Sequence, residues 1–248
     1  MDNKVNILGV NVDKVSIDEA VENIFDMLDE RRPHAVFTPN SEIILSAYKD
    51  AEFCEVLNSA DLLTADGIGV VYASKILGNP IKSRCAGFDV ACGLVDRIAE
   101  TGHRLYLFGG KPGIAEKAKK NLEGKYPFIQ IVGTHNGYFK ESESNEIINE
   151  MNSVGAEIVF VCLGAPKQEK WIAEHKDRIR AKVLMGVGGS LDVFAGTVER
   201  APEFWCKAGL EWFYRLIKEP WRFKRMLALP KFALTVLFHG RRFEGDEE

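Results

Sequence analysis

The sequence lacks the short motifs that mark several large classes of enzyme and metalloprotein. It contains no C-x-x-C, H-E-x-x-H or G-x-S-x-G motif, and no glycine-rich loop that ends in G-K-S or G-K-T. These absences argue against a zinc site, a serine-hydrolase elbow and a P-loop. No D-x-D motif occurs either, so the chain offers no obvious carboxylate pair for a divalent metal. We therefore expect a protein that works without a metal or another cofactor.

Cysteine is scarce in this chain of 248 residues, and the five cysteines are odd in number and widely spaced. They are Cys54, Cys85, Cys92, Cys162 and Cys206. The pattern does not fit a disulfide framework and is typical of buried, reduced thiols in a cytoplasmic protein.

Long hydrophobic runs are also absent. The longest apolar stretch near the C-terminus, Met226–Phe238, is interrupted by Pro230 and Lys231 and is too short to cross a bilayer. Residues 1–20 hold no apolar core of a signal peptide. We therefore expect neither a transmembrane helix nor a signal peptide.

Charge is distributed unevenly along the chain, although the net charge is only −4. Residues 205–242 carry +7, whereas residues 1–204 carry −7. The basic segment also holds three of the four tryptophans, Trp205, Trp212 and Trp221. A basic end on an acidic body indicates a local anionic partner and argues against general nucleic-acid binding.

The basic, aromatic C-terminal segment has two interpretations. Tryptophan beside lysine and arginine is typical of an element at a membrane surface. The alternative is a C-terminal helix whose aromatic side chains pack into the protein core.

Short β-branched runs alternate with helix-compatible segments. The strand candidates are Val5–Leu8, Ala35–Thr38, Leu62–Thr64, Leu105–Phe108, Ile129–Val132, Ile158–Leu163 and Val183–Val187. The helix candidates are Ser16–Glu30, which opens on a capping box, Ser41–Tyr48, Gly67–Leu77, Phe88–Thr101, Pro112–Leu122, Ser144–Met151 and Pro166–His175. This alternation predicts an α/β fold with a Rossmann-like, mostly parallel sheet and helices on both faces. Because the pattern ends near Gly196–Pro202, we predict an α/β domain over residues 1–196 and a helical appendage over residues 197–248.

Polar residues follow two of the early strand candidates. Ligands of parallel α/β sheets bind beyond the carboxyl ends of the strands, so these residues are candidates for a site. Thr38 and Asn40 follow one strand, and Asp66 follows the next. Asn40 and Asp66 each have a second interpretation as helix N-caps. The glycines beside Asp66 favour close approach of a ligand, and its carboxylate is a suitable general base for a sugar hydroxyl.

Two later strand ends carry a glycine pair and a polar cluster. Gly109 and Gly110 precede a helix candidate, where backbone N–H groups can surround a phosphate. They are adjacent, so they do not form the G-x-G-x-x-G dinucleotide pattern. Lys167 and Gln168 lie in the first helical turn after Pro166, where a diphosphate or a base can be held. A lysine is disfavoured at that positive helix end, which suggests a function for it.

The last strand candidate leads into a glycine turn that completes the rim. Gly188 and Gly189 lie in this turn, and Asp192 follows them. Asp192 is a candidate acceptor for a ribose hydroxyl, and its second interpretation is again helix capping.

Six segments in this order closely resemble the WecG/TagA/CpsF glycosyltransferases. They are TPNSE, LTADGIGVVYASKILG, RCAGFDV, LFGGKPGIAEKA, GAPKQEKWI and GVGGSLDVFAGTVERAPEFW. The resemblance covers about residues 5–225, and six ordered motifs are far more specific than any one of them. The motifs look like those of the TagA type, which primes the linkage unit of wall teichoic acid.

The resemblance implies an inverting, metal-independent transfer of N-acetylmannosamine (ManNAc) from UDP-ManNAc to undecaprenyl-diphosphate-GlcNAc. The product would be a lipid-linked ManNAc-β-1,4-GlcNAc disaccharide. A related transferase that uses another UDP-sugar, such as UDP-ManNAcA or UDP-glucose, is the alternative. The family's C-terminal region also implies a cytoplasmic enzyme that associates peripherally with the inner face of the cell membrane.

The resemblance implies a role for each residue that matches a motif. Asp66 would be the base that deprotonates the GlcNAc 4-hydroxyl, and Thr38 and Asn40 would line the same pocket. Arg84 would pair with a phosphate. The glycines of the two turns and Lys167 would complete the substrate-binding rim.

Further positions match the nucleotide-binding and C-terminal parts of the family. Gln168 and Asp192 would hold the uridine or the sugar, and Tyr138 would border the base. Three arginines would close over the diphosphates and stabilise the UDP leaving group: Arg215, Arg222 and Arg225. Pro220 is expected to interrupt the helix that carries them.

Two other classes of function remain as alternatives. One is a Rossmann-type nucleotide-binding protein or oxidoreductase, although the first strand candidate is followed by Gly9-Val-Asn-Val and lacks the dinucleotide fingerprint. The other is a non-catalytic scaffold recruited to membranes by the C-terminal segment. An exposed aromatic segment also predicts a homo-oligomer in solution.

Overall fold

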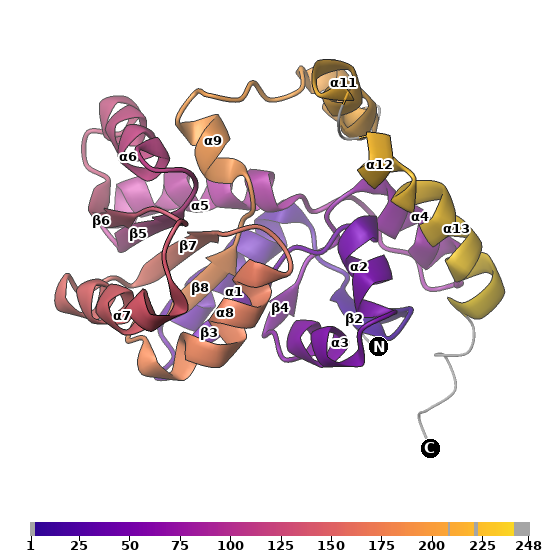
Figure 1. The fold of residues 1–248 in the computed structure, drawn as a ribbon, viewed down its shortest axis with the longest axis horizontal. Helices are drawn as coiled ribbons and strands as arrows, with labels where there is room; N and C mark the ends of the chain where they lie inside the picture. The colour runs from indigo at the N-terminus through magenta and orange to yellow at the C-terminus, as the bar shows by residue number, and fades with distance from the viewer. Residues whose placement is uncertain (1–2, 208, 221–222, 241–248) are drawn as a thin grey trace.

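A six-stranded parallel sheet forms the centre of the computed structural model, which describes residues 3–207, 209–220 and 223–240 (Figure 1). The strand order across the sheet is β4-β3-β8-β7-β5-β6. The strands are β3 (His34–Phe37), β4 (Leu62–Leu63), β5 (Arg104–Gly109), β6 (Gln130–His135), β7 (Ile158–Cys162) and β8 (Val183–Gly186). The chain leaves β5 towards β6 and leaves the neighbouring β7 in the opposite direction towards β8. Ligands of such sheets bind beyond the carboxyl ends of the strands.

Two hydrophobic cores lie on opposite faces of the sheet, because successive strand residues point to opposite sides. In β7, Ile158 and Phe160 join one core, whereas Val159 and Val161 join the other. The helices of the first face are α1 (Ile17–Leu28), α5 (Gly87–Thr101), α6 (Ile114–Lys125) and α9 (Ser190–Phe194). The helices of the second are α2 (Ser41–Ala47), α3 (Ala51–Asn58), α4 (Ile68–Ile76), α7 (Ser144–Ser153) and α8 (Lys167–His175). In Figure 1, α5, α6 and α9 lie above the sheet and α3, α7 and α8 below it. The predicted Rossmann-like parallel sheet with helices on both faces is confirmed.

The first strand candidate does not join this sheet. β1 (Lys4–Ile7) pairs antiparallel with β2 (Val10–Asp13) as a separate two-stranded sheet. The turn between them places Leu8 and Gly9 at positive φ, 55° and 94°. β2 was not expected from the sequence, because the hairpin is very short and its turn is not one of the usual glycine–asparagine pairs.

Most helices lie where the sequence pattern predicted them, and local capping signals mark the starts of α1 and α2. The Ser16 hydroxyl accepts a hydrogen bond from the Glu19 N–H at 3.2 Å, and the Glu19 carboxylate accepts from the Ser16 N–H at 2.7 Å. This is the predicted capping box at the start of α1. α3 was not expected from the sequence, although its N-cap Asp50 accepts from the Phe53 N–H at 3.1 Å. Two short 3-10 helices, η1 (Glu141–Glu143) and η2 (Lys176–Arg178), flank α7 and α8.

Among the described residues, four α-helices follow the last strand and α9. They are α10 (Glu203–Lys207), α11 (Glu211–Lys218), α12 (Phe223–Met226) and α13 (Ala228–His239). α13 packs against α2 and α4, and its Phe232 and Val236 are buried there (Figure 1). In the part of the chain that the structure describes, no helix is both long and apolar enough to cross a membrane.

Candidate functional site

A pocket of about 530 Å³ opens at the carboxyl ends of β3, β7 and β8, and we call it the polar pocket. The segments that follow these strands supply most of its lining. Six of the site residues predicted from the sequence lie in its wall: Thr38, Asn40, Asp66, Gln168, Gly188 and Gly189. The sheet therefore brings together motifs that are up to about 150 residues apart in the sequence, at the edge where parallel sheets bind ligands.

A second pocket of about 440 Å³ lies beside it, between α4 and the C-terminal helices, and we call it the apolar groove. The two pockets share four lining residues, Asn40, Glu42, Asp66 and Phe88. Asp66 thus faces both, so its carboxylate can reach a molecule bound in either one.

Asp66 is held by the backbone of two neighbouring segments. Its N–H donates to the Pro39 carbonyl at 3.2 Å and to the Thr64 carbonyl at 3.1 Å. Its Oδ2 accepts from the Gly87 N–H at 3.4 Å, at the first residue of α5, and an N–H at a helix start interacts favourably with a carboxylate. No side chain caps α4, so the interpretation of Asp66 as a helix cap is wrong.

Thr38 lies against the start of α5. Its hydroxyl donates to the Gly186 carbonyl at 3.3 Å, and its side chain is buried. A Cβ atom at Gly87 would lie 2.5 Å from the Thr38 Oγ1, so only glycine allows α5 to start this close. The absent side chain at position 87 keeps Thr38 and Asp66 on one wall of the polar pocket.

Asn40 is the N-cap of α2, which is one of the two roles that its sequence position predicted. Its Oδ1 accepts from the Glu42 N–H at 2.9 Å and from the Ile43 N–H at 3.1 Å, which caps α2. The same residue lines both pockets. The capping interpretation is therefore confirmed, and contact with a substrate stays a prediction.

Gln168 and Glu169 form a buried chain of hydrogen bonds beside the polar pocket. The Gly188 N–H donates to the Gln168 Oε1 at 3.1 Å, and the Gln168 Nε2 donates to the Glu169 Oε1 at 2.8 Å. Both side chains are buried, and burial raises the pKa of Glu169 above its ordinary value. Glu169 was not predicted from the sequence, because its neighbours in the motif are polar and nothing local marks it as buried.

Arg84 lies at the polar end of the apolar groove. It donates to the Glu211 carboxylate at 2.8 Å and to the Asp89 carboxylate at 3.3 Å. Burial opposes its charge, but hydrogen bonding to Glu211 and the nearby carboxylates, Asp66 included, together raise the pKa of Arg84. A second arginine, Arg200, also pairs with Asp89 and lies over the Phe88 ring. Arg200 was not selected from the sequence, although it lies within the motif that ends in ERAPEFW.

The glycine pair after β5 meets a structural need. Gly109 and Gly110 have φ of 125° and 71°, and a Cβ at Gly109 would lie 2.3 Å from the Cys162 carbonyl oxygen. Gly110 donates to that same carbonyl at 3.0 Å. Neither glycine lines the polar pocket or the apolar groove. Their expected contact with a phosphate stays a prediction.

Three other predicted residues also lie outside both pockets. Lys167 places its Nζ 4.3 Å from the centre of the Phe139 ring and 3.5 Å from the Gly137 carbonyl, which accounts for a lysine at this helix start. Tyr138 is exposed beside it. Asp192 lies inside α9, whose N-cap makes no side-chain hydrogen bond, so Asp192 is not its cap. The substrate contacts expected of these residues stay predictions.

The C-terminal arginines were expected to close over the substrate. Arg222 lies outside the described residues, and so do the side chains of Arg215 and Arg225. The helices α11 and α12, to which Arg215 and Arg225 belong, border the apolar groove through Glu211, Trp212 and Met226. The predicted closure over the diphosphates is therefore untested.

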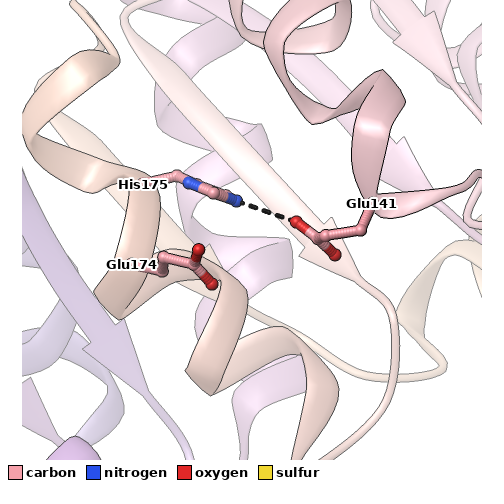
Figure 2. A group of neighbouring side chains, drawn as sticks. All are labelled: Glu141, Glu174 and His175. Carbon is pink, nitrogen blue, oxygen red and sulfur yellow. Dashed lines mark hydrogen bonds and ion pairs between the residues drawn. The ribbon is translucent and has the colours of Figure 1, made fainter.

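Across the described part of the chain, one group of side chains could hold a metal ion: Glu141, Glu174 and His175 (Figure 2). One possible ligand atom from each residue lies within 4.8 Å of the other two. The group's single hydrogen bond joins the His175 Nε2 to the Glu141 carboxylate at 3.3 Å. His175 ends α8, whereas Gln168 at the start of α8 lines the polar pocket. This group therefore lies about 10 Å along the helix from the pocket, given a rise of 1.5 Å per residue.

The fold and the site define a doubly wound α/β protein with a ligand pocket at the carboxyl ends of its strands. The model of the Glycosyl transferase WecG/TagA/CpsF family matches residues 5–245, and the chain belongs to that family. The chain is therefore a glycosyltransferase, which decides against the oxidoreductase alternative.

Named relatives narrow the comparison. The chain is similar to the N-acetylglucosaminyldiphosphoundecaprenol N-acetyl-beta-D-mannosaminyltransferase of Bacillus subtilis strain 168, with 38% identity over 94% of this chain and 89% of the relative. It is 37% identical to the protein of the same name from Bacillus spizizenii strain W23, over 86% of this chain and 82% of the relative. It is 35% identical to the protein of the same name from Staphylococcus aureus strain MRSA252, over 94% of this chain and 92% of the relative.

Proposed function

We propose that this glycosyltransferase transfers ManNAc from UDP-ManNAc to undecaprenyl-diphosphate-GlcNAc. The names of its relatives support this choice of donor and acceptor. The observation that carries the proposal is the place of Asp66, which faces both the polar pocket and the apolar groove. A transferase needs its base where two substrates meet.

In the proposed reaction, the Asp66 carboxylate takes the proton of the GlcNAc 4-hydroxyl. The freed oxygen attacks the anomeric carbon of ManNAc from the side opposite UDP. A C–O bond forms to the acceptor as the C–O bond to UDP breaks, so the configuration inverts and the product is β-linked. A positioned base of this kind contributes about 10²–10⁴-fold to the rate.

The polar pocket suits the donor. Gln168, the Gly188–Gly189 turn and Thr38 offer amide, backbone and hydroxyl groups within one wall. Such neutral groups bind a uridine or a sugar, and Asp192, Tyr138, Lys167 and the Gly109–Gly110 pair would extend the site if the bound state brings them closer.

Cationic side chains would stabilise the diphosphates. Arg84 is half-buried beside Asp66, and its guanidinium matches the geometry of a phosphate. The C-terminal Arg215, Arg222 and Arg225 would add charge to the leaving UDP. Losing one such donor costs on the order of 3 kcal/mol when the donor acts in the transition state. We propose that these arginines replace a metal, because neither pocket's described lining contains the group of Glu141, Glu174 and His175.

The C-terminal helices are proposed to hold the enzyme on the inner face of the cell membrane. Among the described residues, ten of the fifteen exposed large hydrophobic side chains lie in residues 204–240. They are Phe204, Leu210, Trp212, Phe213, Ile217, Phe223, Leu227, Leu234, Leu237 and Phe238. Apolar side chains among basic residues are typical of a helix that lies in the membrane interface.

The test is a transfer assay that follows UDP release from UDP-ManNAc in the presence of EDTA and a short-chain lipid-diphosphate-GlcNAc. The wild type should turn over, and Asp66→Asn should lose at least about 10²-fold in kcat while it still binds UDP-ManNAc. Asp177→Asn, at an exposed aspartate of η2, is the matched control and should keep its activity.

The outcomes separate the parts of the proposal. Full activity of a folded Asp66→Asn variant would remove Asp66 as the base. Turnover only with UDP-ManNAcA or UDP-glucose would keep the class and change the donor. Loss of wild-type activity in EDTA, with recovery on adding Mg²⁺, would overturn the metal-free mechanism. Failure to bind any UDP-sugar would favour a non-catalytic scaffold.

A further inference from the structure

The apolar groove has two chemically different ends. Its inner end holds two arginines, Arg84 and Arg200, beside the carboxylates of Asp66, Asp89 and Glu211. Its outer walls come from α4 and α13, through residues such as Ala73 and Val236, which are 2% and 1% exposed. A molecule that fits this lining has a polar end that can bind the two guanidiniums and a hydrocarbon end.

The hydrocarbon end of the groove opens onto an apolar surface. Tyr72 and Ile76 of α4 line the groove and are 56% and 41% exposed. Leu234 and Phe238 on the neighbouring α13 are 53% and 74% exposed. The groove therefore joins an exposed apolar surface to the wall that holds the candidate base.

Resting on the proposed function, we propose that the groove between α4 and α13 binds the first isoprene units of the acceptor's polyprenyl chain. The diphosphate then lies near Arg84 and Arg200, and the GlcNAc reaches Asp66. The chain continues outward along the apolar surface into the membrane. The enzyme thereby recognises the lipid itself, in addition to the sugar and diphosphate that the lipid carries.

The two arginines of the inner end favour a lipid diphosphate over an apolar protein segment, and a diphosphate must displace the carboxylates that now pair with them. Arg84 already pairs with Glu211 and Asp89, and Arg200 pairs with Asp89. A diphosphate offers these guanidiniums oxygens of higher charge than the carboxylates, whereas an apolar helix of a second copy of this chain would leave them with their present partners.

The first experiment measures binding by calorimetry in detergent-free buffer with three probes: inorganic diphosphate, geranyl diphosphate and farnesyl diphosphate. Each isoprene unit that leaves water for the groove should tighten binding, so farnesyl diphosphate should bind at least about tenfold more tightly than geranyl diphosphate. Equal affinity for the three probes would overturn the proposal. This series needs only the wild-type protein.

A matched pair of variants locates the effect. Ala233 lines the groove from an exposed position on α13, so Ala233→Trp should fill the groove without disturbing the core. It should abolish the preference for farnesyl over geranyl diphosphate and leave the affinity for inorganic diphosphate unchanged. Ala51→Trp makes the same substitution at an exposed residue of α3 that lines neither pocket and should keep the preference. A preference that survives in Ala233→Trp would refute the groove as its origin.

Two results distinguish this inference from the proposed function. A farnesyl preference in a protein that does not use UDP-ManNAc would leave the groove in place and remove only the proposed donor. Transfer from UDP-ManNAc without any preference for prenyl length would keep the proposed donor and remove the groove as the polyprenyl site. If Ala233→Trp changes the molar mass by light scattering while prenyl binding persists, a second copy of the chain occupies the groove and the proposal is wrong.

Discussion

Gly87 permits a contact that no other residue would allow. Its Cα lies so close to Thr38 that an added Cβ would meet the Thr38 Oγ1 at 2.5 Å and the Thr38 Cγ2 at 3.0 Å. Thr38 is buried, so its side chain has little room to move. We predict that Gly87→Ala lowers the free energy of unfolding by about 1–3 kcal/mol, measured by urea denaturation.

A double-mutant cycle separates this contact from other effects of glycine replacement. Thr38→Ala removes the atoms that the new Cβ would meet most closely, so the double variant should lose less stability than the sum of the single variants. Gly124→Ala is the control, because Gly124 lies in α6 and a Cβ added there would meet no atom within 4 Å outside its own helix turn. This variant should gain about 0.5–1 kcal/mol. Strict additivity would show that the contact with Thr38 is not the cause.

Glu169 gives stability a pH dependence with a definite sign. Burial raises its pKa in the folded protein, whereas the unfolded chain has the ordinary value of about 4.3. As pH rises above that value, Glu169 ionises in the unfolded chain but stays protonated in the fold. Its contribution to stability is therefore fully present below about pH 4 and is lost as pH rises towards the folded pKa.

Glu169→Gln should remove this loss, because glutamine does not ionise. The free energy of unfolding of the wild type minus that of Glu169→Gln should fall as the pH rises above about 4, measured by denaturant titration. Glu174→Gln, at an exposed position of the same helix, is the control and should show a smaller change. A difference that is flat with pH would mean that Glu169 ionises as easily in the fold as in the unfolded chain.

At the scale of elements, the starts of α1 and α2 were predictable because their capping signals are local. The Ser16–Glu19 capping box and the Asn40 cap act over three residues, and the sequence carries both partners. Asp66 shows the limit of such signals. It stands where a cap would stand, but its carboxylate accepts from Gly87, which lies 21 residues further along. Only the packing of α5 against the end of β4 decides between the two.

An ion pair that the sequence did not reveal joins α11 to the rest of the protein. Arg84 and Glu211 are 127 residues apart, and their side chains are 16% and 17% exposed. A pair that is mostly removed from water is screened less than a surface pair. We predict that Glu211→Gln increases amide hydrogen exchange in α11 by about tenfold, while the strands of the central sheet keep their protection.

The control for this prediction is Glu199→Gln. Glu199 faces Lys218 of the same helix at 3.8 Å, but its side chain is 84% exposed, and such pairs contribute little. Equal exchange in α11 for both variants would mean that the apolar contacts of α11, and not Arg84, hold it in place.

At the scale of the whole molecule, the exposure of aromatic side chains of residues 204–240 to water is energetically unfavourable. We predict that the protein self-associates in detergent-free solution, with a molar mass by light scattering that rises with concentration. Anionic vesicles should reduce this association, because both processes cover the same side chains, and added salt should weaken the vesicle binding. A strictly monomeric protein at high concentration would contradict the prediction.

Residues distant in the sequence meet at the site because of strand order. Thr38 follows β3, Gln168 follows β7 and Gly188 follows β8, and these three strands are neighbours in the sheet. Gly109 is the last residue of β5, one strand further away, and Gly110 follows it. Both glycines lie outside the polar pocket. Hydrophobic periodicity does not encode which strands pair. The sequence alone therefore could not show which of these strand ends share a pocket.

The sequence by itself determined the class of fold, most helices and strands, and the family. These depend on local patterns: the alternation of β-branched and helical runs, short capping signals, and motifs of a few residues. The tertiary structure decided which motif residues share a wall, that Glu169 is buried, that Arg84 meets Glu211, and that Asp66 faces two pockets. The physical reason is that burial and long-range contact depend on how the elements pack, and packing is a property of the whole chain.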